Sequence, residues 1–241
     1  MPADPIPAST VILVKETSNG LQTYLLEKSK NLEFAGGAYV FPGGTIQKQD
    51  RNPEWFSHIS GVPFPDWQKN FVDCSEIDLL GFYISALREL FEEAGILLCQ
   101  SPPPESLKKL RKSLLKGKPF LALIKEHHLK LSSERLIYLS HWITPEVFKT
   151  RFSARFFITE ISPEQTPSPD RGELLTGIWI SPQKALEQYK KNQISLMFPT
   201  MTTLQELSHF KTVKEILGWG RKFPKTPRQP WVDEKGEIHL E

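Results

Sequence analysis

The sequence predicts an α/β sandwich. Dense β-branched runs such as Thr10–Val14 mark strands, and one long segment, Ile77–Ala94, has apolar residues at helical spacing. Strands and helices follow one another in mixed order, which favours an α/β sandwich over a regular alternation of parallel strands and crossover helices. The 241 residues are 39% hydrophobic and include 15 Phe and 6 Trp, enough for the core of one large domain.

The strands expected before the long helix lead to a glycine-rich stretch. A strand over Thr10–Val14 is followed by Asn19-Gly20, a strong hairpin signal, and by a return strand over Leu21–Leu26. A short strand over Ala38–Phe41 then enters Pro42-Gly43-Gly44, expected to be a loop. Its glycines allow the backbone to approach a ligand closely. This loop is therefore a candidate part of a binding site.

The long helix is expected to bury one face and to end at Gly95. The apolar positions that define this face are Leu80, Ile84, Leu87 and Phe91. Downstream helices are predicted over Leu107–Leu115, Phe120–His127, Pro182–Lys190, Thr202–Phe210 and Thr212–Leu217, and strands over Leu136–Trp142, Arg155–Ile161 and Glu173–Ile180. We expect a single domain over residues 8–220 with a helical C-terminal extension, an aromatic-rich insertion at 45–78, and a proline-rich tail at 221–241 that wraps the surface.

Composition excludes several functional classes. The formal charge of +2 is too small to indicate nucleic-acid or membrane binding. The two cysteines form no metal-binding spacing and suit a reducing compartment. Apolar runs are too short for a membrane span, no signal peptide is evident, and residues 238–241 are not a peroxisomal signal. A cytoplasmic location is the expectation.

Three carboxylates of the long helix form a candidate metal site. Glu89, Glu92 and Glu93 stand at positions i, i+3 and i+4, which places them on one helix face. Like charges at this spacing destabilise a helix by about 0.2–0.5 kcal/mol per pair, unless they face water or hold a cation. Mg²⁺ prefers such oxygen ligands and often accompanies a phosphate substrate. A solvated acidic face is the competing interpretation.

Together with Gly44, the segment Arg88-Glu89-Leu90-Phe91-Glu92-Glu93-Ala94-Gly95-Ile96 resembles the nudix box, G-x5-E-x7-R-E-U-x-E-E-x-G-U, where U is aliphatic. The second half matches at every defined position. About thirty residues are inserted between Gly44 and Arg88, and Leu80 stands where counting back from Arg88 places the first glutamate. Asp50 or Asp78 is expected to replace that glutamate.

A long insertion inside the box resembles the coenzyme A diphosphatases of the nudix motif 19 group. Further similar segments are Leu25–Ser29 with Val40–Gly44, Arg151–Phe157, Trp179 with Ser181-Pro182, and Phe198-Pro199-Thr200. The resemblance spans about Thr10–Leu207. It implies a nudix-type α/β/α sandwich and Mg²⁺-dependent (or Mn²⁺-dependent) hydrolysis of the pyrophosphate of coenzyme A or acyl-coenzyme A. The implied products are 3′,5′-ADP and (acyl-)4′-phosphopantetheine.

The resemblance also implies roles for individual residues. Glu92, Glu93 and the carbonyl of Gly43 are expected metal ligands, and Glu89 is either a further ligand or the base that orients the water. Arg88 is expected to hold Glu92. Weaker candidates are Glu173 as a catalytic loop glutamate, with Glu160 as its rival, and Lys28, Arg155, Gly44 and Arg151 as substrate contacts.

Two other functions compete with this hypothesis. One is a nudix hydrolase that acts on another nucleotide derivative, such as ADP-ribose or NADH. The other is a non-catalytic nudix module that senses a nucleotide. The role of the insertion, as a lid over the substrate or as a structural brace, is left open by the sequence.

Overall fold

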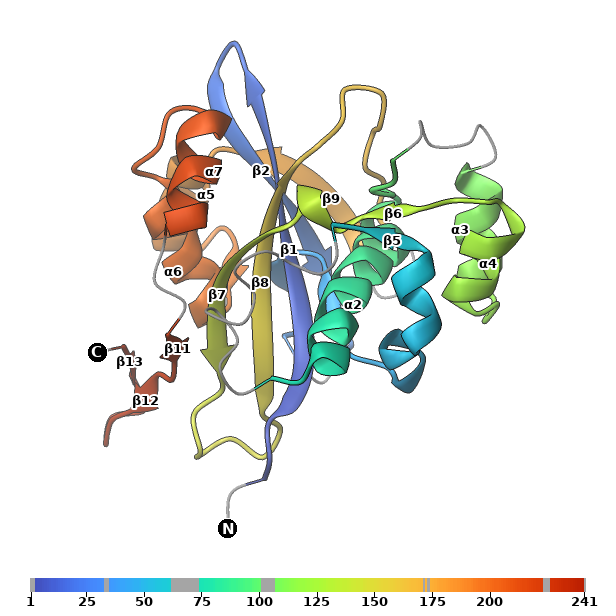
Figure 1. The fold of residues 1–241 in the computed structure, drawn as a ribbon. Coiled ribbons are helices and arrows are strands. Elements are labelled where there is room, and N and C mark those ends of the chain that lie inside the picture. Colours follow the sequence, from blue (N-terminus) through green and yellow to red (C-terminus); the bar gives the residue numbers. More distant parts are fainter. Residues whose placement is uncertain are drawn as a thin grey trace.

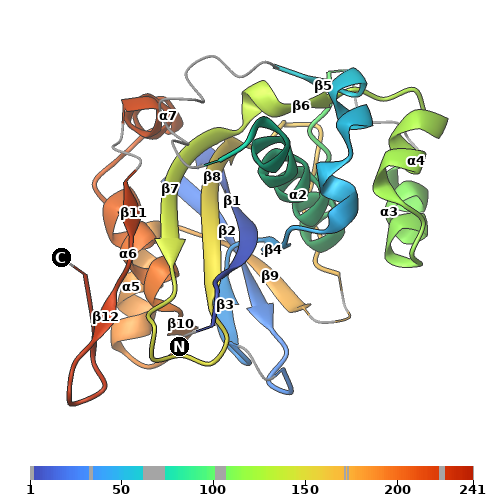
Figure 2. The same cartoon turned by 60° about the horizontal axis from the view of Figure 1, so that its bottom comes forward.

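The computed structural model describes residues 3–32, 35–61, 74–100, 107–170, 172, 174–222 and 226–240. A mixed sheet forms the middle layer (Figures 1 and 2). Helix α2 (Glu76–Ala94) covers one face, and α5 (Pro182–Lys190), α6 (Phe198–Leu207) and α7 (Val213–Lys222) cover the other. The predicted α/β/α sandwich is therefore confirmed.

Strand β1 (Ile6–Thr17) is the centre of the sheet. It pairs antiparallel with β2 (Gly20–Lys28) and parallel with β8 (Phe152–Glu160). The described strand order is β10-β3-β2-β1-β8-β7-β11, with β9 also paired to β2 and β4 to β1. The remaining bounds are β3 Ala38–Val40, β4 Gly43–Thr45, β7 Ile137–Ile143, β9 Leu174–Ile180, β10 Ser195–Leu196 and β11 Pro227–Arg228.

The hairpin of β1 and β2 opens at one end, and the glycine-rich stretch fills the opening. The two strands pair only from Val14–Thr17 to Gly20–Thr23. Beyond that, β2 pairs with β3, and residues 8–10 of β1 pair with β4. Gly43–Thr45 is thus a short strand and not the expected loop. Pairing with β1 places these glycines beside α2.

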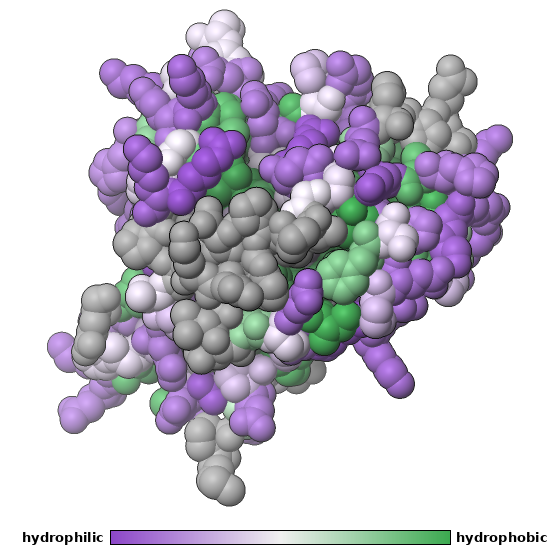
Figure 3. Space-filling view, viewed as in Figure 1, coloured by the Kyte–Doolittle hydropathy of each residue, from purple (hydrophilic) through white to green (hydrophobic). Residues whose placement is uncertain are grey.

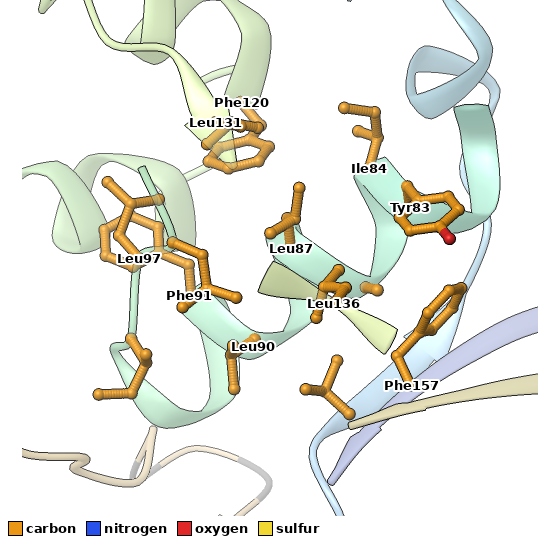
Figure 4. Close-up of a cluster of buried hydrophobic side chains, with 14 of the residues drawn as sticks. Tyr83, Ile84, Leu87, Leu90, Phe91, Leu97, Phe120, Leu131, Leu136 and Phe157 are labelled. Carbon is orange, nitrogen blue, oxygen red and sulfur yellow. The ribbon is translucent and has the colours of Figure 1, made fainter. Parts of the chain in front are cut away.

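Helix α2 carries the first core. Its apolar residues pack against side chains from β7, β8 and the segments that follow α2 (Figure 4). The labelled residues in that view are Tyr83, Ile84, Leu87, Leu90, Phe91, Leu97, Phe120, Leu131, Leu136 and Phe157. Ser75 caps the first turn by accepting a hydrogen bond from the Asp78 N–H, and Gly95 ends the helix at φ 70°. The predicted helix and its glycine stop are confirmed.

The opposite face of the sheet carries the second core under α5, α6 and α7. Helix α6 begins at Phe198, before the expected Thr202, because Pro199 fits the first turn of a helix. The tail adds β11 to the edge strand β7 and then forms a hairpin of β12 (Trp231–Val232) and β13 (Ile238–His239). It therefore extends the sheet as well as covering the surface.

The described part of the insertion is a brace. It contains η1 (Lys48–Arg51), η2 (Pro53–Ser57) and β5 (Ile59–Ser60), which pairs with β6 (Leu131–Ser132). Trp55 is only 1% exposed and packs on Phe120, with ring centroids 5.4 Å apart. This tryptophan therefore packs the insertion onto the body of the domain. Phe56 also packs against the first core, and Phe64, Trp67 and Phe71 lie outside the described residues.

Helices α3 (Leu107–Leu115) and α4 (Phe120–Glu126) flank the end of α2, and η3 (Ser133–Arg135) leads into β7. In the view of Figure 3 hydrophilic residues make up most of the described surface, with smaller hydrophobic areas between them. Among the described helices, none has the length and apolar character to cross a bilayer.

Candidate active site

Arg88 organises the last turns of α2. Its side chain is 0% exposed, and its Nη1 donates to Glu89 Oε1 at 2.6 Å and to Glu92 Oε2 at 3.0 Å. A buried guanidinium is tolerated only when it is paired and hydrogen-bonded. The Arg88 guanidinium thus holds two of the three predicted metal-binding carboxylates, Glu89 and Glu92, close together. The expected contact between Arg88 and Glu92 is present.

Asp50 binds the Arg88 guanidinium on the edge that Glu89 and Glu92 leave open. Arg88 Nε and Nη2 donate to the two Asp50 oxygens at 3.0 and 2.8 Å, and both side chains are 0% exposed. Asp78, the other candidate to replace the first glutamate of the box, pairs with Arg51 at 2.8 Å instead. Asp50 stands six positions after Gly44, which is the offset of that glutamate in the box. The extra residues therefore follow Asp50, and counting forward from Gly44 identifies it.

The glycines of β4 are required by close packing against β1 and α2. A Cβ added at Gly43 would lie 2.8 Å from Thr10 Cα, and one at Gly44 would lie 2.5 Å from Glu89 Oε1. The Gly43 N–H donates to Glu93 Oε2 at 2.7 Å. The backbone of β4 is thereby held against the carboxylates of α2, and a side chain at either glycine would push the two apart.

The electrostatics of the cluster suit a divalent cation. The pKa of Glu89 is raised to about 7: burial is the largest cause, the charge of Arg88 opposes the shift, and the charge of Glu92 adds to it. The pKa of Glu92 is also raised, chiefly by burial. Crowded, partly desolvated carboxylates disfavour their own negative charge, and a bound cation would offset that cost. Carboxylate and carbonyl oxygens are the donors that Mg²⁺ and Mn²⁺ prefer, so the residues present fit such an ion.

Arg111 fixes the C-terminal end of α2. Its Nε and Nη2 donate to the Glu92 carbonyl oxygen at 2.9 and 2.6 Å, and Nη2 also donates to the Glu93 carbonyl oxygen at 2.9 Å. Its Nη1 donates to the Ser168 carbonyl oxygen at 2.9 Å. From the sequence, the basic residues of α3 were expected to form a solvated face or to contact the 3′-phosphate of coenzyme A. Arg111, the one arginine among these lysines, binds the end of α2 instead. The planar guanidinium can bind several carbonyls at once, which lysine cannot do in the same geometry.

We expect Arg111→Met to lower kcat/KM about 10- to 100-fold, the usual cost of losing a residue that orients metal ligands. Without the guanidinium the last turn of α2 loses its carbonyl partners, so the carboxylates of Glu92 and Glu93 are held less firmly. The half-saturating concentration of metal should therefore rise. The measurement is diphosphate hydrolysis as a function of metal concentration, with exposed Lys112→Met on the same helix as control. An unchanged metal requirement would contradict this role.

A cavity of about 550 Å³ opens beside the carboxylate cluster. Glu89, Glu93, Gly43, Gly44 and Lys28 line it, so five of the predicted site residues meet there. Glu92 is not among the described lining residues and accepts a hydrogen bond from Arg88. The cavity is thus lined both by candidate metal ligands, Glu89, Glu93 and Gly43, and by Lys28, the lysine expected to contact the substrate.

Three of the weaker candidates lie away from this cavity. Arg155 is outside the described lining of the cavity; its Nη1 donates to the Tyr138 hydroxyl at 2.8 Å and its guanidinium lies over the Phe82 ring. Arg151 donates to the carbonyl oxygens of residues 3 and 144. Glu160 is exposed at the end of β8, and Glu173 lies outside the described residues.

Comparison with known proteins agrees with this geometry. A model of the NUDT19 Nudix domain matches residues 6–207. The acyl-coenzyme A diphosphatase NUDT19 of Xenopus laevis is 26% identical over 244 residues, covering 84% of this chain and 63% of the relative. The Homo sapiens protein of the same name is 27% identical over 240 residues, covering 83% and 64%. The chain therefore spans less than two-thirds of the length of these relatives.

A solved structure supports the fold. The crystal structure of a nudix hydrolase from Alicyclobacillus acidocaldarius superposes with a TM-score of 0.76 at 22% identity, covering 90% of this chain and 96% of that chain. At this identity the likeness concerns the fold. It extends over nearly the whole of both chains.

Proposed function

This chain belongs to the nudix family, and we propose that it is a metal-dependent diphosphatase that hydrolyses the pyrophosphate of coenzyme A or acyl-coenzyme A. The products would be 3′,5′-ADP and (acyl-)4′-phosphopantetheine. One observation carries the proposal: Glu89 and Glu93 face a cavity that Lys28 also lines, while Arg88 and β4 hold these carboxylates in place. The names of the similar proteins from Xenopus laevis and Homo sapiens support the choice of substrate.

Glu89, Glu92, Glu93 and the carbonyl of Gly43 would hold the ion, Mg²⁺ or Mn²⁺. When bound, such an ion stabilises negative charge on phosphate oxygens and makes a bound water more acidic. Arg88 fixes the orientation of two carboxylates through its hydrogen bonds to Glu89 and Glu92. Lys28 supplies a positive charge inside the cavity that would partner the diphosphate.

Glu89 is the residue placed to position the attacking water. Its carboxylate faces both the cavity and the backbone of Gly44, so a water beside it would lie next to the diphosphate. Its remaining interaction, with Arg88, holds the carboxylate in one orientation. Glu89 would accept the proton of that water or bind the ion that holds it.

The test is a substrate panel with product identification. Coenzyme A, acetyl-coenzyme A, ADP-ribose and NADH are incubated separately with the protein and Mg²⁺ or Mn²⁺, and the products are identified by mass spectrometry. We expect 3′,5′-ADP from both coenzyme A compounds, and no turnover when EDTA removes the metal. Absence of 3′,5′-ADP would overturn the proposal. Hydrolysis of only ADP-ribose or NADH would indicate another nudix substrate, and nucleotide binding without turnover would indicate a sensor module.

A further inference from the structure

The geometry points to an acyl-binding pocket at the far end of the cavity, closed by residues 226–240, in which Ile238 limits the length of the acyl chain. This inference rests on the proposed function and extends it to a part of the chain outside the family match, which ends at residue 207. Pro230 and Ile238, both from this C-terminal segment, line the same cavity as Glu89 and Glu93.

The chemistry of the lining identifies the occupant. Away from the carboxylates, side chains from β7, β8, the loop between them and α6 make the wall largely apolar. They include Trp142, Ile143, Pro145, Phe148, Phe152 and Phe198. Lys28 is the one cationic side chain among the described residues of the lining. A 3′-phosphate at the far end would lack a charged partner among the described lining residues, at a high desolvation cost, whereas a hydrocarbon chain gains by leaving water.

The C-terminal segment is anchored firmly enough to act as a fixed wall. Strand β11 pairs with β7, and Arg228 Nη2 binds Glu206 Oε1 of α6 at 2.7 Å. The Arg228 guanidinium also lies 5.0 Å from the Trp142 ring centroid, and Trp142 itself lines the cavity. Pro230 is buried directly after these contacts. A wall held by sheet pairing, an ion pair and a cation–π contact defines a fixed end for the cavity.

Ile238 is the best residue of this wall to substitute, because Val232 offers a matched control position. In the β12–β13 hairpin it is paired with Val232, and of the two only Ile238 is among the lining residues. The cavity volume of about 550 Å³ falls within the ordinary range for small-molecule sites. Each further methylene that enters it should lower KM about fourfold, the equivalent of about 0.8 kcal/mol, until the chain reaches Ile238.

The experiment measures kcat and KM for free coenzyme A and for saturated acyl-coenzyme A thioesters of increasing length. In the wild type we expect KM to fall with chain length and then to level off or rise. Ile238→Ala should move this turning point to longer chains, and Ile238→Phe should move it to shorter ones. The kcat and KM for free coenzyme A should stay within about twofold in both variants, and Val232→Ala should leave the whole profile unchanged.

A binding measurement separates this inference from the proposed function. Calorimetric titration of the same thioesters into the intact protein, with EDTA present, reports affinity without turnover. If coenzyme A is not hydrolysed but the length dependence of binding shifts in the Ile238 variants, the proposed function fails and the pocket stands. If hydrolysis occurs but chain length has no effect, the pocket is overturned. The pocket would also be overturned if Val232→Ala shifted the chain-length profile as much as Ile238→Ala does. The same holds if the Ile238 variants changed the affinity for free coenzyme A as much as the affinity for the thioesters.

Discussion

Glu93→Gln should lower diphosphate hydrolysis about 10³-fold or more while leaving the fold intact. The carboxylate of Glu93 is expected to bind the divalent ion, whose stabilisation of the transition state is worth several kcal/mol, and each 1.36 kcal/mol is a factor of ten in rate. The glutamine amide oxygen can still accept the hydrogen bond that Gly43 N–H donates to Glu93 Oε2 at 2.7 Å. The substitution therefore removes a charge and a ligand but keeps the contact between α2 and β4.

The comparison uses Glu76→Gln, the same change at an exposed position in the first turn of the same helix. That variant should retain activity within about twofold. Both variants should show the wild-type circular dichroism spectrum and similar melting temperatures. Full metal-dependent activity in Glu93→Gln would refute the assignment of Glu93 as a metal ligand.

Elements whose signals lie in their own residues, such as helix α2, could be predicted from the sequence. Helix α2 has apolar residues at helical spacing and a glycine with positive φ at its end, so its bounds agree with the expectation to within one residue. The glycine stretch of β4 was expected as a loop, because glycine is depleted in strands. What makes it a strand is the open end of the β1–β2 hairpin, which exists only in the tertiary structure.

The candidate site was predictable where the box is contiguous. Glu89, Glu92, Glu93 and Arg88 stand on one stretch of helix, and the structure brings them together as expected. Arg155 was placed with the substrate by resemblance, but alternation along β8 puts it on the face opposite Ala154 and Phe156, both of which line the cavity.

Arg111 could not be predicted, because its role depends on α3 packing across the end of α2. An amphipathic helix with four basic residues among nine gives no local signal that one of them binds carbonyls. The residue that replaces the first glutamate of the box was narrowed to Asp50 or Asp78, and counting forward from Gly44 selects Asp50. Its contact with Arg88 depends on the path of the insertion, which turns at η1 and returns to α2.

Asp50→Ala should destabilise the protein by about 3–5 kcal/mol, the usual cost of removing one partner of a buried ion pair. Arg88 would keep its charge in a site with no access to water, and two of its hydrogen bonds, at 2.8 and 3.0 Å, would be lost. Activity should fall as well, because Arg88 would no longer be held where it orients Glu89 and Glu92. Chemical denaturation gives the free energy of unfolding, and steady-state kinetics gives the activity.

Two further variants separate stability from function at this pair. Asp50→Glu supplies the carboxylate that the nudix box has at this offset and should recover part of both properties. The double variant Asp50→Leu with Arg88→Met removes both charges of this pair, so part of the stability should return, although Glu89 and Glu92 lose their cationic partner. Activity should stay low because nothing orients Glu89 and Glu92. As control, Asp78→Ala breaks the partly exposed pair with Arg51 and should cost no more than about 1 kcal/mol. Recovery of full activity in the double variant would show that the ion pair serves stability alone.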